Sequence, residues 1–238
     1  LAEVCPPDDP AAMRVFADYG AMFVAKGVDI PWRCVLNGEK EVQLFQSEVD
    51  KETAVIGGVQ VTLQSEAMAA LLTARKQAAA EGLAITPRGG PTGSTRSYAD
   101  TLRNWESRFG PALEYWTNKG RIKRDEAAAA RNAEIRTQVA MVLDWEKRGI
   151  YFSKDLSKSI LYSVAVPGAS QHNFMLALDV AQYGNPRVRE IMARNGWFQT
   201  VKSDLPHFTF LGRTETELKS LGLTDVMAGG QKFWIPNL

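Results

Sequence analysis

The chain has 238 residues, of which 45% are hydrophobic and 23% are charged, and its formal net charge is +1 at pH 7. This composition is ordinary for a globular protein with a substantial core. The near-neutral charge gives no reason to expect a nucleic acid or an acidic surface as partner, and no apolar run is long enough to span a bilayer.

The N-terminal region is predicted to begin with a helix over residues 11–19, which have helical composition, and to stop at Gly20. Residues 23–25 and 42–45 are predicted as strands, the second because apolar and polar side chains alternate. No constellation of chemically active residues occurs here. We therefore expect an N-terminal subregion that packs on the main domain.

Residues 1–60 are assigned to this subregion and residues 61–238 to the main domain. Cys5 and Cys34 are the only two cysteines, and in an oxidising compartment they would form a disulfide that holds the proline-rich N-terminal segment. Two free buried thiols are the alternative. The sequence begins at Leu1, as a processed secretory precursor or an artificially shortened chain would.

The central part of the chain is predicted to be mostly helical. Residues 65–81 form one helix that ends before Gly82, and residues 83–85 form a strand. Ser97 is a suitable N-cap for the next helix because Asp100 follows three residues later. Its apolar face has the spacing of a core helix and consists of Tyr98, Leu102, Trp105, Phe109, Leu113 and Trp116.

The remaining elements follow in order towards the C-terminus. Residues 124–148 are predicted as a third long helix and residues 161–166 as a strand. Asn185-Pro186 and Asn195-Gly196 have the composition of the start and end of a helix. Residues 207–210 are predicted as a strand with alternating faces, and residues 233–236 as a last edge strand.

Both histidines of the chain have an aspartate nearby in the sequence: Asp179 follows His172, and Asp204 precedes His207. Two imidazoles and one carboxylate with an open fourth position make the ligand set of a catalytic zinc ion, which would leave Asp204 to act as a base. Residues 175–180 read as a buried strand, where a carboxylate is costly unless it is paired or binds a metal. Two ordinary hydrogen-bonded histidines remain the alternative.

Three segments, taken in order, resemble the LAS zinc peptidases, which include D-alanyl-D-alanine carboxypeptidases, vancomycin-resistance D,D-peptidases and L-alanyl-D-glutamate peptidases. Thr95 to Tyr98 is similar to the R-S-Y segment of that family. Two further segments are similar to its signatures S-x-H-x-x-G-x-A-x-D and [ED]-x-x-H, and the matching residues are Ser170, His172, Ala177, Asp179, Asp204 and His207.

The resemblance implies an α+β fold of the hedgehog or D,D-peptidase type, in which a small antiparallel sheet flanked by helices carries the zinc site, here with an N-terminal extension. It implies a zinc metallopeptidase of the cell envelope, secreted or periplasmic, that hydrolyses peptidoglycan stem peptides at D-Ala-D-Ala or L-Ala-D-Glu bonds. The oligomeric state is not indicated. The implied zinc ligands are His172, Asp179 and His207.

The resemblance also assigns roles to the residues around the metal. Asp204 would be the base, where many members have glutamate, and Arg96 and Ser170 would bind substrate. Gln171, Tyr98 and Trp197 are further candidates for the wall of the cleft. Met175 stands where the family usually has glycine. The alternative function is a non-catalytic, zinc-dependent protein that binds a peptide or partner on the same fold.

Overall fold

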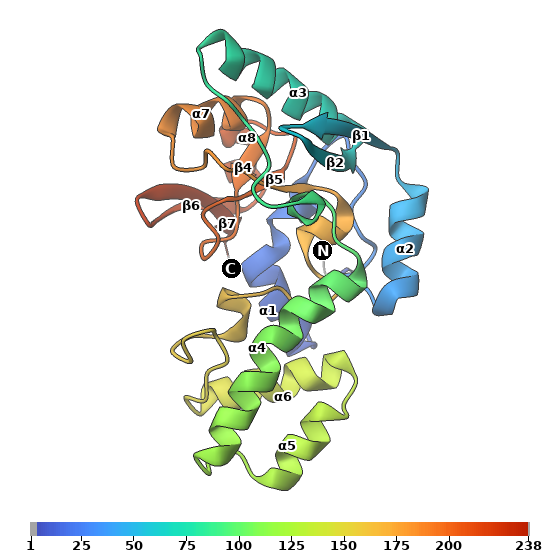
Figure 1. Ribbon diagram of the computed structural model, residues 1–238, viewed down its shortest axis with the longest axis vertical. Coiled ribbons are helices and arrows are strands. Elements are labelled where there is room, and N and C mark those ends of the chain that lie inside the picture. Colours follow the sequence, from blue (N-terminus) through green and yellow to red (C-terminus); the bar gives the residue numbers. More distant parts are fainter. Residues whose placement is uncertain (1–3, 238) are drawn as a thin grey trace.

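The computed structural model describes residues 4–237 and shows a mixed α+β protein (Figure 1). The helices are α1 (Pro10–Tyr19), α2 (Gly38–Glu48), α3 (Ser65–Ala80), α4 (Tyr98–Asn118), α5 (Arg124–Arg131), α6 (Ile135–Lys147), α7 (Pro186–Arg194) and α8 (Glu215–Ser220). The strands are β1 (Lys51–Ile56), β2 (Val59–Gln64), β3 (Ala177–Asp179), β4 (Trp197–Gln199), β5 (His207–Phe210), β6 (Leu223–Ala228) and β7 (Gln231–Pro236).

The strands of the described residues form three small antiparallel sheets. One is the hairpin β1–β2, one has the strand order β3-β5-β4, and one is the hairpin β6–β7. Helices α4, α5 and α6 lie together at one end of the molecule, away from the three sheets (Figure 1). The predicted fold class, a small antiparallel sheet flanked by helices, is confirmed.

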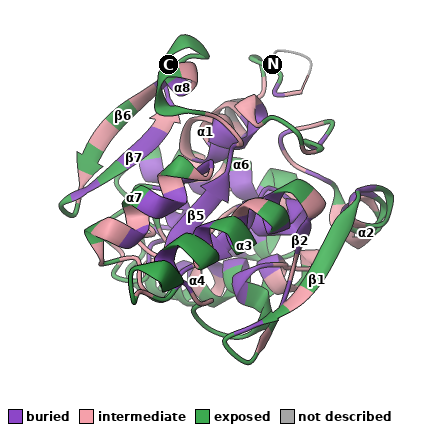
Figure 2. Cartoon of the chain, turned by 90° about the horizontal axis from the view of Figure 1, so that it is seen from above, coloured by how far each residue is buried: buried purple, intermediate pink, exposed green. Residues whose placement is uncertain are grey.

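The central sheet is covered by α3 and α7. Phe208 of β5 and Trp197 of β4 are almost fully buried, in the same apolar cluster as Leu71 of α3 and Ile191 of α7. Figure 2 shows β5 as a buried strand behind α3, whose outward face is exposed. The short strands β3 and β5 are therefore fixed from one side by helix packing, which gives the residues at their ends a rigid support.

Several predicted elements are confirmed, together with the signals that predicted them. The helix expected over residues 11–19 is α1. The side chain of Ser97 accepts a hydrogen bond from the Asp100 N–H, and the Asp100 carboxylate accepts one from the Ser97 N–H, which completes the capping box of α4. Asn185 caps α7, and the last strand is β7.

Other predictions of local structure are wrong. Residues 42–45 lie in helix α2, where Val42 and Phe45 are buried three residues apart, and residues 23–25 fall in and just after a 3₁₀ turn. Neither residues 83–85 nor residues 161–166 form a strand. Over only four residues, a strand-like alternation of apolar side chains cannot be distinguished from helical spacing. Residues 42–45 are helical because this conformation buries Val42 and Phe45 in the core.

The predicted helix over residues 124–148 is two helices, α5 and α6, with a break at residues 132–134. The Asn132 side chain donates a hydrogen bond to the Ala128 carbonyl, which is one of the last carbonyl groups of α5. The hairpin β1–β2 was not predicted. Gly57 and Gly58 both have positive φ, which is the backbone requirement of a two-residue type I′ turn.

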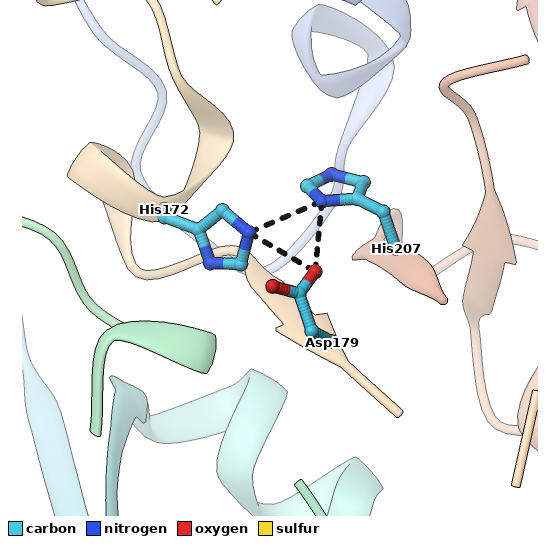
Figure 3. Close-up of side chains that lie close together, drawn as sticks. All are labelled: His172, Asp179 and His207. Carbon is cyan, nitrogen blue, oxygen red and sulfur yellow. Dashed lines mark hydrogen bonds and ion pairs between the residues drawn. The ribbon is translucent and has the colours of Figure 1, made fainter. Parts of the chain in front are cut away.

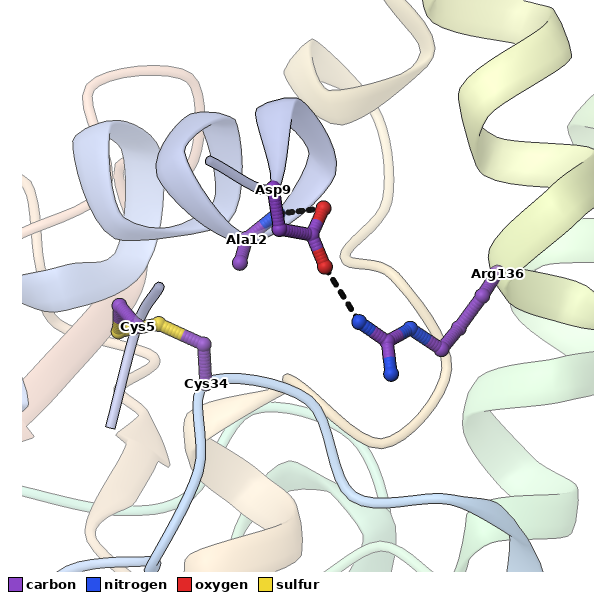
Figure 4. The surroundings of a disulfide bond; sticks show 5 residues. All are labelled: Cys5, Asp9, Ala12, Cys34 and Arg136. Atoms are coloured by element: carbon purple, nitrogen blue, oxygen red, sulfur yellow. Dashed lines mark hydrogen bonds and ion pairs between the residues drawn. A yellow bond between two sulfur atoms is a disulfide. The ribbon is translucent and has the colours of Figure 1, made fainter. Parts of the chain in front are cut away.

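The N-terminal segment is attached to the body of the protein at two places (Figure 4). Cys5 and Cys34 form the predicted disulfide. The Asp9 side chain accepts hydrogen bonds from the N–H groups of Ala11 and Ala12 at the start of α1, and it pairs with Arg136 of α6. Helix α1 is therefore tied to the helical end of the molecule as well as to the disulfide loop.

The division at residue 60 stays a prediction, and that residue lies within β2. Among the described residues, no helix combines the length and the apolar character needed to cross a membrane.

Candidate metal centre

Three neighbouring elements carry the two histidines and Asp179. His172 lies in a 3₁₀ turn, η4 (Gln171–Phe174), that leads into β3. Asp179 is the last residue of β3, and His207 is the first residue of β5. The antiparallel pairing of β3 with β5 places Asp179 directly opposite His207, so the register of two short strands brings together residues that are 28 positions apart.

Met175 turns the chain from η4 into β3. Its backbone is left-handed, with φ +54° and ψ +33°, and its side chain is buried. This conformation costs a non-glycine residue roughly 1–2 kcal/mol. The backbone therefore has the handedness that glycine favours, although the residue is methionine, and the buried side chain offsets part of the cost through its apolar contacts.

The side chains of His172, Asp179 and His207 converge on one point (Figure 3). The His172 Nε2 and His207 Nδ1 atoms are 3.1 Å apart, and the Asp179 Oδ1 atom lies 3.4 Å from each of them. Both imidazoles are buried, and Asp179 is partly exposed. These three atoms could hold a metal ion, so the predicted ligand residues are brought together by the fold.

In each imidazole, the nitrogen that points away from the cluster lies against an oxygen that can only accept a hydrogen bond. His172 Nδ1 lies 3.1 Å from the Ser94 carbonyl oxygen, and His207 Nε2 lies 2.6 Å from Gln171 Oε1. Both outer nitrogens must therefore carry their ring hydrogen. In a neutral ring with this tautomer, the inner nitrogen has a free lone pair, which is the state that a metal ion requires.

The two oxygens of Asp179 have different surroundings. Oδ1 is buried and accepts no hydrogen bond from any described residue, whereas Oδ2 accepts one from Arg96 Nη2 at 2.9 Å. Arg96 is itself fixed, because its Nε donates to the Thr92 carbonyl and its backbone N–H donates to the His172 carbonyl. Two imidazole nitrogens and an unpartnered carboxylate oxygen that face one another are a set of atoms that could bind a cation.

Burial and the close contacts within the cluster both shift its acid–base properties. Burial is the main cause that lowers the pKa of His172 to about 4, so this ring is neutral at pH 7. Burial alone would raise the pKa of Asp179, but its interactions with His172 and His207 outweigh burial and hold the pKa below its usual value. At neutral pH the cluster therefore contains an ionised Asp179 and a neutral His172.

Asp204 lies beside the cluster and supplies none of its three converging atoms. Burial raises the pKa of Asp204, and the negative charge of Asp179 acts in the same direction, while His207 opposes them. Its backbone carbonyl accepts from the His207 N–H at 3.1 Å, which fixes the turn between the two residues. A carboxyl group with a raised pKa in a cleft is a candidate acid or base.

The cluster opens into a cleft of about 790 Å³ between the sheets and the helical end of the molecule. The residues predicted to act with the metal, Arg96, Ser170 and Asp204, all line this cleft. A second hollow, which also reaches Arg96 and Asp204, continues on the other side towards Arg88 and Tyr183. Of the residues predicted for the wall of the cleft, Gln171 lines it, whereas Tyr98 and Trp197 do not. The sequence gave no signal for Ser94.

No family model matches the chain, and no curated protein matches it. Among solved structures, the chain is similar to one described as "VanYB in complex with D-Alanine-D-Alanine", with 16% sequence identity and a TM-score of 0.38. The likeness covers 70% of this chain and 80% of that chain. The function proposed below therefore rests on the geometry of the site and on the sequence motifs, and not on this likeness.

Proposed function

We propose that the protein is a zinc-dependent peptidase that hydrolyses peptide bonds of peptidoglycan stem peptides. The observation that carries the proposal is the triangle formed by His172 Nε2, His207 Nδ1 and Asp179 Oδ1, with sides of 3.1, 3.4 and 3.4 Å. Zinc bonds to histidine and carboxylate are about 2.0–2.2 Å long, so the ligand atoms of a tetrahedral site lie roughly 3.3–3.6 Å apart.

The donor set also favours zinc chemically. Two imidazoles and one carboxylate leave one position of a tetrahedral ion free, which is the arrangement of catalytic rather than structural sites. When bound, a zinc ion would lower the pKa of a water molecule from about 15.7 towards 7 and would polarise the scissile carbonyl.

Asp204 is the residue proposed to move protons. It lies in the cleft beside the ligands without being one of them, and its raised pKa brings it closer to the range in which a base both accepts and returns a proton near neutral pH. It would take the proton of the attacking water and pass it to the leaving amine. A base positioned in this way contributes about 10²–10⁴ in rate.

The substrate class is proposed from the motifs of the sequence. By resemblance, Arg96 binds a substrate oxygen and Ser170 contacts the peptide, and both line the cleft. The bond cleaved is D-Ala-D-Ala or L-Ala-D-Glu. A disulfide between Cys5 and Cys34 is consistent with a place of action in the cell envelope, where thiols are oxidised.

The proposal is tested by two measurements on purified protein. Elemental analysis should find about one zinc per chain, and mass spectrometry of muropeptides should find cleavage that a chelator abolishes. Asp204→Asn should keep the zinc and lose activity by about 10²–10⁴, whereas His172→Ala should lose the zinc. Asp225→Asn, on the outlying strand β6, is the matched control.

Zinc binding without cleavage of either bond would instead support the alternative of a zinc-dependent binding protein. Cleavage at the wild-type rate by Asp204→Asn would remove that residue from the mechanism. A protein that binds no zinc from a buffered solution would contradict the proposal as a whole.

A further inference from the structure

The cleft extends well beyond the metal centre, and its far end is lined by positive charge. From His172 and Asp204 it runs along α4 to the segment formed by residues 153–163. Arg108 of α4 lines this far end together with Lys154 and Lys158. None of the three is used by the proposed chemistry, so their position in the same cavity calls for a separate explanation.

These three cations have no carboxylate partner within salt-bridge distance among residues 4–237. Arg108 donates through Nη1 to the backbone and hydroxyl oxygens of Ser107, and its Nε is buried without an acceptor. Lys158 lies over the ring of Tyr162, with its Nζ 4.1 Å from the ring centre. The Nη2 group of Arg108 makes no hydrogen bond within the described residues, so it remains available to an anion in the cleft.

One carboxylate does lie among these cations, but it is turned to other partners. Asp155 accepts hydrogen bonds from the hydroxyl groups of Ser153 at 2.6 Å and Ser157 at 2.7 Å. It forms no salt bridge with Lys154 or Lys158 within the described residues. The three cations therefore outnumber the single carboxylate, and the far end of the cleft has a net positive charge.

The rise along α4 gives the scale of the cleft between Arg96, which contacts Asp179, and Arg108. Thr101, Asn104 and Arg108 follow one another at intervals of three and four residues, so they share the helix face that lines the cleft. From Tyr98, next to Arg96, to Arg108 is a rise of ten residues, or about 15 Å at 1.5 Å per residue. An extended peptide covers this length with about four or five residues at 3.3 Å each.

We propose that Arg108, Lys154 and Lys158 form a subsite for a carboxylate group of the substrate, several residues from the bond that is cleaved. The inference rests on the proposed function, since it assumes that a peptide occupies the cleft. The substrate class is then an acidic peptide of at least four residues, and a dipeptide would use only the metal end. Guanidinium and ammonium groups that line one cleft can bind a carboxylate by charge-assisted hydrogen bonds.

The test compares two synthetic peptides, Ala-γ-D-Glu-Lys-D-Ala-D-Ala with its free glutamate carboxylate and the same peptide with that group amidated. The zinc-loaded wild-type protein should cleave the acid with a kcat/KM at least about tenfold above that of the amide. In the triple variant Arg108→Gln, Lys154→Gln, Lys158→Gln the preference should vanish, while the amide is cleaved at the wild-type rate. Arg103→Gln, on the exposed side of α4, is the matched control.

Calorimetric binding of both peptides to the zinc-loaded Asp204→Asn protein separates the subsite from the proposed function. The wild-type protein cleaves neither peptide if the peptidase assignment is wrong. If the acid nevertheless binds about tenfold more tightly than the amide, and the triple substitution removes this difference, the subsite stands without the peptidase assignment. Equal binding and equal cleavage of the two peptides by the wild-type protein would overturn the subsite. A preference that persists in the triple variant would also overturn it.

Discussion

The Gln171 side-chain oxygen lies 2.6 Å from His207 Nε2 and is the hydrogen-bond acceptor of that ring. The same oxygen accepts from the Thr209 hydroxyl at 2.5 Å, and the Gln171 amide nitrogen donates to the Tyr19 carbonyl at 2.9 Å. Gln171 is fully buried. This residue therefore connects helix α1 to the candidate metal centre and orients the ring of His207 so that Nδ1 faces Asp179.

Replacing Gln171 by leucine should weaken zinc binding. Leucine has a similar volume but cannot accept the His207 N–H, so the ring is free to rotate or change tautomer. Loss of such a supporting contact typically costs 10–100-fold in metal affinity, and we expect a loss of this size. The measurement is a zinc competition titration against a chromophoric chelator.

Gln171→Glu is the matched control for that experiment, because the carboxylate keeps an acceptor for His207 and should hold zinc at least as tightly as the wild type. Thermal unfolding of both metal-free variants separates metal binding from general damage. Wild-type zinc affinity in Gln171→Leu would show that the contact does not position the ring.

The sequence was sufficient to select the candidate metal ligands and insufficient to reveal the groups that hold them in place. His172, Asp179 and His207 could be selected because their side chains are of the types that bind zinc and because their spacing resembles a known pattern. The partner of His172, the Ser94 carbonyl, is a backbone atom 78 residues away. Any residue type could provide a carbonyl there, so only the fold reveals it.

The fold was predictable where local chemistry is decisive. The Ser97 and Asp100 side chains complete their capping box within one helical turn, and this required no knowledge of distant residues. Residues 42–45 of helix α2 were predicted as a strand. Their helical conformation depends on the burial of Val42 and Phe45 in an apolar cluster that is assembled from distant segments. Tertiary packing determined these outcomes, and it is absent from a window of four residues.

Arg96 should affect the metal as well as the substrate. The resemblance assigns it to substrate binding, but in the structure it donates to Asp179 Oδ2 at 2.9 Å and to the Thr92 carbonyl. Arg96→Ala should therefore lower zinc affinity by roughly tenfold or more, because the Asp179 carboxylate loses the contact that orients it. A zinc titration and a kcat/KM measurement at saturating zinc distinguish the two effects.

Arg88→Gln is the matched control for Arg96, since it removes a cation from the hollow beside Asp179 without removing a contact to that carboxylate. A residue that serves only as a substrate anchor would raise KM and leave zinc affinity unchanged. That result in Arg96→Ala would assign Arg96 to substrate alone.

The disulfide should contribute substantially to stability. Cys5 and Cys34 are separated by 29 residues, and closing a loop of this length in the unfolded chain corresponds to about 3–4 kcal/mol by loop entropy. The double variant Cys5→Ser, Cys34→Ser should lose up to that amount in urea unfolding. Reduced wild-type protein should behave like the double variant, and equal stability of the oxidised and reduced forms would contradict the expected contribution.

Glu146 should make stability depend on pH. It is buried on α6; Oε1 accepts the Ile160 N–H at 2.6 Å, and Oε2 has no partner among the described residues. Burial raises the pKa of Glu146 above 4.5, although hydrogen bonds from Ser159 and Ile160 oppose it. The folded state therefore binds the proton more tightly than the unfolded state, and the stability that this group contributes falls as the pH rises from about 4.5 through the raised pKa.

Glu146→Gln mimics the protonated side chain, so it should match the wild type near pH 4 and be more stable at pH 8. The expected gain is roughly 1 kcal/mol, or about 2–4 °C in Tm for a chain of this size. Thermal unfolding of both proteins at pH 4, 6 and 8 measures the difference, with Glu114→Gln on the exposed side of α4 as control. A difference between the two proteins that stays constant across this range would mean that Glu146 carries the same charge in the folded and unfolded states.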